Sequence, residues 1–530
     1  MRKVLVGVAT LVVAQVFPQT GWMPLSREVE RPFSALMYRT GSTIHTAIRP
    51  YRSSEILALD PKDTLRLPSA LAALDKWAGV RNGRAFRWGP LVDAQAIYSS
   101  DTSSSYIGHR VGGGVWAERD IGAKLTFHLD GQVWNERFPT YLDTLARATQ
   151  MSAGEGYAYG DAPNYTHYDW NAYVSWDPGK YFNFTLGRGK NFFGEGYRSL
   201  LLSDEATSYP FLKITTTVWH IKYVNLFTVM NDIRGADGNP ADFNRKYTSM
   251  HYLSWNASKR LNVALFEAVV WSQGDSLFPR GFDMNYLNPI IFYRPVEYSI
   301  GSPDNALIGG ALNVRVGKHT LIYSQVMLDE FLMKEVRAGN GWYGNKQAAQ
   351  LGVVARDAFK VPGLQLRLEW NLVRPFMYTH SDTRQNYAHM GQPLAHPYGS
   401  NFQELIGQVE WSHGRWLHSI RTSTAWLGSD TTFSNGNNIF RPEDDRLGSA
   451  SGHRDFGYRI GNAVGYSLFH GELRTGYLLD ANTGTRIEAS YLFRQRTGEG
   501  DPQLAHVFRL GLVCHFRERH PEQEVRYVLN

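Results

Sequence analysis

A stretch of alternating residues near the C-terminus, 503–516 (QLAHVFRLGLVCHF), constrains the fold more than any other feature. The large apolar residues share one face and the other face is mixed: Leu504, Phe508, Leu510, Leu512, Cys514 and Phe516 lie opposite Gln503, Ala505, Arg509, Gly511 and His515. A period of two residues indicates a β-strand with one apolar face. Globular strands usually have about 5–6 residues, whereas strands that cross a bilayer at a tilt have about 9–11. The length of this stretch therefore favours a membrane strand over a strand of a soluble sandwich.

Other stretches repeat the same pattern, among them residues 121–133, 364–372 and 486–496. In residues 364–372 every even position is Leu or Trp, and the odd positions are polar: Gln365, Arg367, Glu369 and Asn371. A soluble sandwich buries the apolar face, whereas a membrane barrel turns it to lipid and turns the charged face to the lumen. Alternation alone does not choose between these folds.

The connections between the strands favour the membrane barrel. Short connections are expected near residues 118–120, 177–180, 257–259, 317–319, 360–363, 412–414 and 469–471, and they alternate with long ones at 137–164, 190–210, 232–245, 272–304, 332–346, 378–401 and 428–455. Short turns at one end and long loops at the other are typical of outer-membrane barrels, which have an even number of strands in single-chain bacterial proteins. The sequence therefore predicts an all-β, transmembrane antiparallel outer-membrane β-barrel of about eighteen strands.

Four regions are expected along the chain. Residues 1–14 resemble a secretory signal peptide, with Arg2 and Lys3 before an apolar core that is too short to span a membrane. Residues 15–85 are expected to form a small, partly helical periplasmic segment, with helix boundary signals in 68–79. Residues 86–516 form the predicted barrel, and residues 517–530 form a C-terminal tail. The destination predicted by these regions is the outer membrane of a Gram-negative type of cell.

The composition fits this prediction. Beyond the N-terminus we find no apolar run of the ~18 residues that a membrane helix needs, yet 13% of the residues are aromatic and 50 are glycine. Aromatic residues form the interfacial girdles of membrane barrels. The formal charge of +6 is compatible with an anionic partner such as acidic polysaccharide. Cys514 is the only cysteine, so an internal disulfide and a cysteine metal site are excluded, and its position predicts a lipid-facing side chain.

Four stretches carry more polar and aromatic chemistry than strands require. In residues 186–204 the glycines lack the lysine and helix of a phosphate loop, and a loop that folds inward is expected. In residues 285–305 Tyr and Phe alternate with Arg294, Glu297 and Asp304, which suits either a sugar or an interfacial girdle. The adjacent acids Asp329 and Glu330 point to opposite faces of a strand, so hydrolysis by a carboxylate pair is not expected. The histidines in 374–404 lack metal-ligand spacing, and a structured surface loop is predicted.

Short motifs scattered over residues 86–516 resemble the outer-membrane capsule-assembly family Wzi and related proteins associated with gliding or secretion. The matching positions are Gly187-Arg188-Gly189 through Gly196 and Ser199, Asn288-Pro289 with Tyr293-Arg294, Asp304-Asn305, Asp329-Glu330-Phe331, Arg374-Pro375 with Tyr378, and His396-Pro397 with Gly399-Ser400-Asn401. The end of the chain also resembles the assembly signal of outer-membrane barrels, at Arg509, Gly511, Cys514 and Phe516. The resemblance implies an eighteen-stranded barrel with a helical periplasmic N-terminus and lectin-like, non-catalytic attachment of capsular polysaccharide.

The leading functional prediction is a non-enzymatic barrel that binds or organises surface polysaccharide, with outer-membrane lipid and an anionic glycan as partners and no cofactor, metal or nucleic acid. The predicted glycan-binding residues are Tyr293, Arg294, Glu297, Asp329, Arg374, Tyr378, His396 and Asn401. One alternative is a diffusion channel for polar or anionic solutes that uses Lys124, Arg367 and Arg494 in the lumen. Another is a structural accessory of an envelope export, secretion or gliding complex.

Overall fold

The structure is a closed antiparallel β-barrel. The computed structural model describes residues 21–39, 44–57, 86–236, 238–274, 280–291, 304–446, 455–462, 464–498 and 500–529. The barrel consists of the 18 strands β2 (Phe86–Asp101), β3 (Ser105–Ile121), β4 (Leu125–Arg137), β5 (Asn164–Trp176), β6 (Phe182–Gly189), β8 (Tyr209–Val218), β9 (Ile221–Asp232), β10 (Asn244–Asn256), β11 (Leu261–Ser272), β12 (Asn305–Val316), β13 (Thr320–Leu328), β14 (Gln347–Arg356), β15 (Leu364–Val373), β18 (Phe402–His413), β19 (Trp416–Leu427), β20 (Tyr466–Asp480), β21 (Thr485–Thr497) and β22 (Gln503–Val513). The predicted fold class and strand number are confirmed.

Smaller elements lie in the loops and inside the barrel. The described helices are α1 (Arg27–Arg39), α2 (Ser53–Leu57), α5 (Thr140–Thr149) and α7 (Met333–Ala338), with 3-10 turns η1 (Pro240–Asp242), η2 (Met284–Leu287), η3 (Ala358–Lys360), η4 (Thr383–Gln385) and η5 (Glu443–Arg446). Two short ribbons pair β1 (Ile48–Arg49) with β7 (Phe192–Phe193), and β16 (Ala388–His389) with β17 (Gln392–Pro393). The predicted helix in residues 68–79 and the predicted signal peptide lie outside the described residues.

Closure of the barrel joins the two ends of the sheet. Each strand pairs with its neighbours in the chain, and β2 pairs with β22 from Ala94↔Leu512 to Asp101↔Ala505. A Cβ atom at Gly511 would lie 2.0 Å from the carbonyl oxygen of Ala94, so only glycine fits this close approach of the two strands. Closure gives the first and last strands of the sheet hydrogen-bonding partners, so that no open sheet edge faces lipid.

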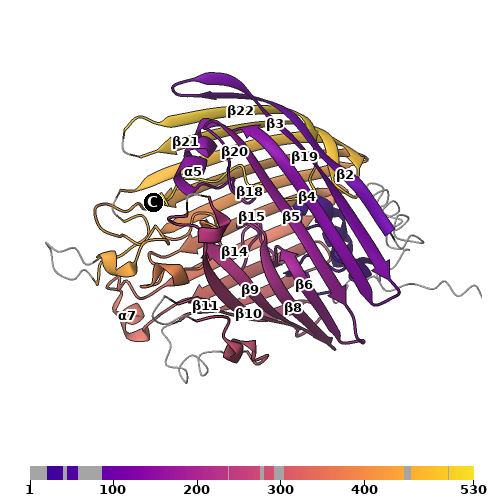
Figure 1. Ribbon diagram of the computed structural model, residues 1–530, viewed down its shortest axis with the longest axis horizontal. Helices are drawn as coiled ribbons and strands as arrows, with labels where there is room; N and C mark the ends of the chain where they lie inside the picture. The colour runs from indigo at the N-terminus through magenta and orange to yellow at the C-terminus, as the bar shows by residue number, and fades with distance from the viewer. Residues whose placement is uncertain are drawn as a thin grey trace, which may run out of the picture.

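The turns and loops segregate as predicted. In Figure 1 the loops that carry α5 and α7 lie at the left end of the barrel, whereas the short turns lie at the right end. Two predicted turns are wrong in position, because residues 118–120 belong to β3 and residues 469–471 belong to β20, whose following turn spans 481–484. We refer below to the long-loop end and the short-turn end.

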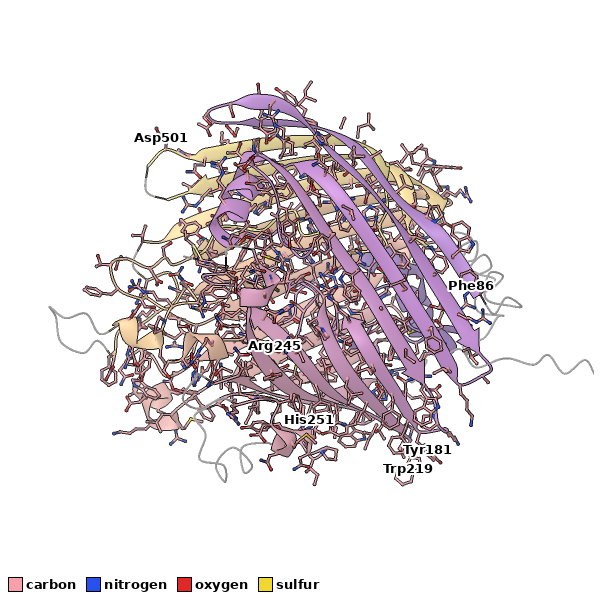
Figure 2. The ribbon with its side chains drawn as sticks, in the orientation of Figure 1. Phe86, Tyr181, Trp219, Arg245, His251 and Asp501 are labelled. Carbon is pink, nitrogen blue, oxygen red and sulfur yellow. The ribbon has the colours of Figure 1, made fainter. Side chains whose placement is uncertain are left out.

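The outer face is apolar, as the alternation predicts. Leu368 is 53% exposed whereas Glu369 beside it is fully buried inside the barrel, and Leu510 is 61% exposed. Exposed aromatic side chains gather at the short-turn end, where Figure 2 labels Phe86, Tyr181 and Trp219. No helix in the described part of the chain has both the length and the apolar character needed to span a membrane.

The end of the last strand differs from the prediction. β22 ends at Val513, and Cys514 and Phe516 turn inward, where they pack with Leu91 and Trp116. The expectation that Cys514 faces lipid is therefore wrong, because alternation stops where the strand stops. From this point the tail runs back through the barrel, and the C-terminus lies at the long-loop end (Figure 1).

Candidate functional site: a filled lumen below the long loops

The loop between β6 and β8, residues 190–208, folds into the lumen, which confirms the inward loop predicted from its glycines. The carboxylate of Glu369 in β15 accepts hydrogen bonds from the backbone N–H groups of Tyr197 and Arg198, at 2.6 and 3.0 Å. The side-chain oxygen of Gln325 accepts a third, from Leu200, at 2.8 Å. Polar side chains of the barrel wall thus satisfy the backbone of a buried loop, which otherwise would be costly to bury.

The N-terminal segment enters the same space. Helix α1 places Glu28 within 3.3 Å of Arg474 in β20 and 3.0 Å of Arg486 in β21. Arg31 of the same helix lies 2.6 Å from Glu410 in β18. The ribbon of β1 and β7 then joins this segment to the inward loop. The lumen-facing charges of the alternating strands are therefore the partners of internal elements.

The tail is the third internal element. Arg517 pairs with Asp130 and Asp169, and Arg519 pairs with Asp93. Further along the tail, Arg526 donates to the backbone oxygen of Ser400 at 2.7 Å, and the N–H of Leu529 donates to Ala148 at 2.8 Å. The tail is thus bound along its length, from the wall strands to the long-loop end.

The inward loop, the tail and the barrel wall meet at Arg198, which is 1% exposed. Its guanidinium lies 2.8 Å from Glu205, 3.1 Å from Glu522 of the tail and 3.5 Å from Glu404 of β18. Arg421 of β19 lies 3.0 Å from the same Glu522. Removing one partner of such a buried network leaves an uncompensated charge, which typically costs about 3–5 kcal/mol.

Asp329 and Tyr378, two predicted glycan-binding residues, contact each other below the loop surface. The N–H of Tyr378 donates to the Asp329 carboxylate at 3.2 Å, and the Tyr378 hydroxyl donates to the backbone oxygen of Leu200 at 2.8 Å. Both side chains are buried. Burial raises the pKa of Asp329 to about 7, although the ammonium group of Lys346 opposes the shift. These residues fasten the long loops to the inward loop.

His396 and Asn401 have a similar place. The N–H of Tyr398 donates to Nδ1 of His396, which puts the ring proton on Nε2, where it donates to Glu404 at 2.7 Å. Burial lowers the pKa of His396, which favours this neutral form. Asn401 donates to the backbone of Asn435 at 3.2 Å and accepts from Gly461 at 2.9 Å. Both residues are fully buried.

Arg374 is half-buried, and its Nε atom donates to the backbone oxygen of Asn345 at 2.8 Å. The structure therefore brings five of the eight predicted residues to the long-loop end, four of them buried. Tyr293, Arg294 and Glu297 lie outside the described residues. Glycan binding by this set stays a prediction.

An aromatic cluster lies at the surface of the long-loop end, and we define it as Trp342, Tyr343 and Phe456. The N–H of Tyr343 donates to Asp455 at 2.9 Å, and the N–H of Gly457 donates to Asn340 at 2.9 Å, so two loops hold the cluster together. Phe456 is 50% exposed, and Trp342 and Tyr343 are half-buried. The guanidinium of Arg446 lies 3.4 Å from the centre of the Tyr343 ring. Sequence reasoning did not select this cluster, because its members come from loops about a hundred residues apart.

The residues of the predicted channel do not share one environment. Lys124 is exposed in the turn between β3 and β4, so its predicted place in the lumen is wrong. Arg367 faces the lumen, where it donates to the Tyr323 hydroxyl at 3.0 Å. Arg494 pairs with Glu524 of the tail. The two lumen arginines are therefore engaged by other parts of the chain.

Arg198, Glu522 and the tail were missed from the sequence. Basic and acidic side chains alternate in residues 517–526 (RERHPEQEVR), which indicates that the segment has ion-pair partners on both of its faces. A short charged C-terminus is usually solvated, and only the burial of its partners reveals its path. The matching signal in the strands was the set of charged residues that face the lumen, such as Glu369 and Arg421, because buried charges need partners inside the barrel.

Comparison with known proteins gives a fold but no close relative. No family model matches the chain, and no curated protein matches it. Among solved structures, the outer-membrane protein Wzi of Escherichia coli, described as a carbohydrate-binding β-barrel involved in group 1 capsule assembly, aligns with a TM-score of 0.58 and 14% identity over 92% of this chain and 99% of Wzi.

More distant matches are outer-membrane proteins of Pseudomonas aeruginosa. OprD aligns at 7% identity and a TM-score of 0.40 over 80% of this chain and 94% of OprD, and OccK8 (OprE) aligns at 9% and 0.41 over 80% and 97%. An identity as low as that with Wzi shows the fold alone. The resemblance inferred from the short motifs is confirmed at that level, and the chain folds as an outer-membrane β-barrel with the architecture of Wzi.

Proposed function

We propose that this protein is a non-enzymatic outer-membrane barrel that binds surface polysaccharide at its long-loop end. The observation that carries the proposal is the filled lumen. Ion pairs of Arg198 join the inward loop to the tail and the wall, and ion pairs of Arg27 and Arg31 join α1 to the inward loop, the tail and the wall. A lumen built in this way favours a fixed platform for the loops over a diffusion channel. Rigid barrels that hold long loops commonly use those loops for binding.

The aromatic cluster has the chemistry that a sugar chain needs. Aromatic faces pack against the C–H groups of a sugar ring, and neighbouring charged groups supply directional hydrogen bonds. Phe456 and the exposed Arg459 lie on one of the two loops, and Trp342 lies on the other. Arg459 supplies a positive charge for an anionic polysaccharide. Asp329, Tyr378, His396 and Asn401 then act as positioning residues below this surface, and Tyr293, Arg294 and Glu297 remain candidate contacts.

A tryptophan pair provides the test. Purified full-length protein is screened against immobilised acidic and neutral polysaccharides, with Trp342→Ala as the test variant and Trp219→Ala as the control, because Trp219 is 92% exposed at the opposite end of the barrel. We expect binding by the wild type and the control and a loss of about tenfold for Trp342→Ala, which corresponds to about 1.4 kcal/mol. Absence of glycan binding by the wild type, or equal loss in both variants, contradicts the proposal.

The other assignments of this proposal are export by a signal peptide in residues 1–14 and a periplasmic position for residues 15–85, from which α1 enters the barrel. Their support is the basic and apolar start of the sequence and the position of α1 at the short-turn end (Figure 1). N-terminal sequencing of the mature protein tests the first, and protease digestion of intact cells tests the second. An uncleaved N-terminus, or digestion of this segment from outside, contradicts the respective assignment.

A further inference from the structure

A cavity of about 70 Å³ lies inside the barrel between the tail and the wall. Its floor is formed by strands β20, β21 and β22. Its other sides are formed by residues of β2, β3, β4 and β19, by α5 and the loop after it, and by residues Arg519 to Pro521 of the tail. The register places Ser490 of β21 opposite Arg509 of β22 on one side and opposite Arg474 of β20 on the other. Two arginines therefore flank a serine hydroxyl across three adjacent strands, and all three side chains line the cavity.

One of these arginines lacks a counter-charge. Among the described residues of the cavity lining, Arg110, Arg421, Arg474 and Arg519 each lie within ion-pair distance of a carboxylate, whereas Arg509 does not. Arg509 interacts instead with the hydroxyl of Tyr141, which itself donates to Pro521 at 2.5 Å. Arg474 is paired with Glu28 at 3.3 Å and with Glu472, whose carboxylate lies 3.5 Å from Nε of Arg474. The cavity thus has a guanidinium on each side of Ser490, and that of Arg509 has no carboxylate partner among the described residues.

An unpaired guanidinium inside a protein is unfavourable unless an anion or water compensates it. Guanidinium groups form charge-assisted and often bidentate hydrogen bonds with planar or tetrahedral oxyanions. The serine hydroxyl adds a donor that rotates to fit. This combination recognises carboxylate, phosphate or sulfate oxygens. Four glutamates also line the cavity, and each of them is paired with an arginine: Glu136, Glu155, Glu472 and Glu488.

The size of the cavity limits the ligand. One water needs about 10–15 Å³ by the same measure, so the cavity holds on the order of five small heavy atoms. A phosphate or sulfate ion, or the carboxylate of an acidic sugar, has this size. We propose that the cavity is a binding site for a small oxyanion, held between Arg509, Ser490 and Arg474 and closed by Arg519 of the tail. The bound anion fixes the tail to the wall.

This site lies inside the barrel, apart from the aromatic cluster, and its test does not depend on glycan binding at the surface. Purified full-length protein in detergent is titrated calorimetrically with inorganic phosphate, sulfate or glucuronate at constant ionic strength. The test variants are Arg509→Gln and Ser490→Asp, and the control is Arg415→Gln, which removes an exposed arginine from a turn at the short-turn end.

Saturable binding is expected for the wild type and for Arg415→Gln. Arg509→Gln should weaken it about tenfold to hundredfold, because a charge-assisted hydrogen bond is lost. Ser490→Asp places a carboxylate between the two arginines and should abolish binding while it keeps the barrel folded. Tighter binding of glucuronate identifies a sugar acid as the source, and tighter binding of phosphate or sulfate identifies a free ion.

Two results overturn the proposal. The first is a wild type that binds none of the three anions. The second is binding that persists unchanged in both Arg509→Gln and Ser490→Asp, since the ion then sits elsewhere. Because Ser490→Asp supplies its own anion, its folded yield should equal or exceed that of Arg509→Gln, and the pair keeps the test valid if Arg509→Gln assembles poorly.

Discussion

Glu522 of the C-terminal tail lies 3.1 Å from the guanidinium of Arg198 on the inward loop and 3.0 Å from that of Arg421 in the wall. One carboxylate therefore joins three parts of the chain that are remote in sequence. The Tyr197 hydroxyl also donates to it, so both of its oxygens are engaged. The arrangement makes the tail part of the folded barrel interior rather than an appendage.

We expect Glu522→Ala to loosen the tail. The change leaves two buried guanidinium groups with one partner fewer, and breaking a buried pair costs about 3–5 kcal/mol. Hydrogen exchange of residues 517–529 should rise strongly, with little change in the barrel strands. Asp501→Ala, which removes an exposed acid at the long-loop end, serves as the control. Unchanged exchange in Glu522→Ala means that the ion pairs do not hold the tail.

Substitutions at two adjacent residues of β15 should impair the protein in different ways. Leu368→Arg puts a charge on the lipid face, at a cost of about 2–4 kcal/mol near the bilayer centre, and should reduce the heat-modifiable folded band on gels. A residue on a water-filled lumen face usually tolerates replacement by Ala, but the buried carboxylate of Glu369 holds two backbone N–H groups of the inward loop. Each unsatisfied group costs about 1–3 kcal/mol, so the barrel should assemble while residues 190–208 become sensitive to protease. Equal folded yields and equal protease patterns for the two variants contradict this assignment of faces.

Stability of the loop attachment should fall as the pH rises from about 4 to about 7. The pKa of Asp329 is raised to about 7 in the folded protein, against about 3.9 in an unfolded chain. The folded state therefore favours the protonated carboxyl, and this advantage is complete below pH 4 and lost as pH passes 7. At about 1.4 kcal/mol for each pKa unit, the loss of folded-state stability above pH 7 reaches up to about 4 kcal/mol.

Asp329→Asn keeps an acceptor for the N–H of Tyr378 and removes the charge. Its loop should resist hydrogen exchange better than the wild type at pH 8 and match it near pH 4. Asp501→Asn, at an exposed position, should follow the wild type at both values. Parallel pH profiles for wild type and Asp329→Asn would contradict the raised pKa.

The barrel could be predicted from the sequence because the features that specify it are local. In β15 each residue faces lipid or lumen according to its parity, and loop length alternates because every second connection lies at the same end. Residues 469–471 were mistaken for a turn because of Gly471, yet His470 is buried in the lumen and the strand continues. A glycine in a strand and a glycine in a turn look alike without the partner strand.

The candidate site was harder to predict from the sequence because it is formed by contacts between residues that are far apart in the chain. Tyr378 and His396 carry the side chains expected of a sugar site, but Leu200 and Glu404 draw them inward. The direction of a loop depends on which segment fills the space beneath it. Cys514 is buried for the same reason, because the environment of its side chain depends on the position at which β22 ends and on Trp116 beside it.

Polysaccharide retention should depend on Arg294 and Arg374 if acidic sugar chains meet the long loops. The Arg294→Ala/Arg374→Ala variant should retain less cell-surface polysaccharide than the wild type at equal barrel abundance. Since exposed charge contacts are screened by salt, retention should also weaken as ionic strength rises. Arg415→Ala, on the opposite end, is the matched control. Unchanged retention, together with no glycan binding by purified wild type, rejects the polysaccharide function.

Removal of the tail should distinguish a platform from a channel. In planar bilayers we expect low conductance for the wild type, because α1, the inward loop and the tail share the lumen. A chain that ends at Phe516 keeps β22 whole but loses the tail residues that pair with Asp130, Asp93, Arg198 and Arg494. Its conductance should rise, and a synthetic peptide of residues 517–530 added in excess should lower it again. High conductance of the wild type supports the diffusion channel instead, and a shortened chain as tight as the wild type shows that the other two elements close the lumen without the tail.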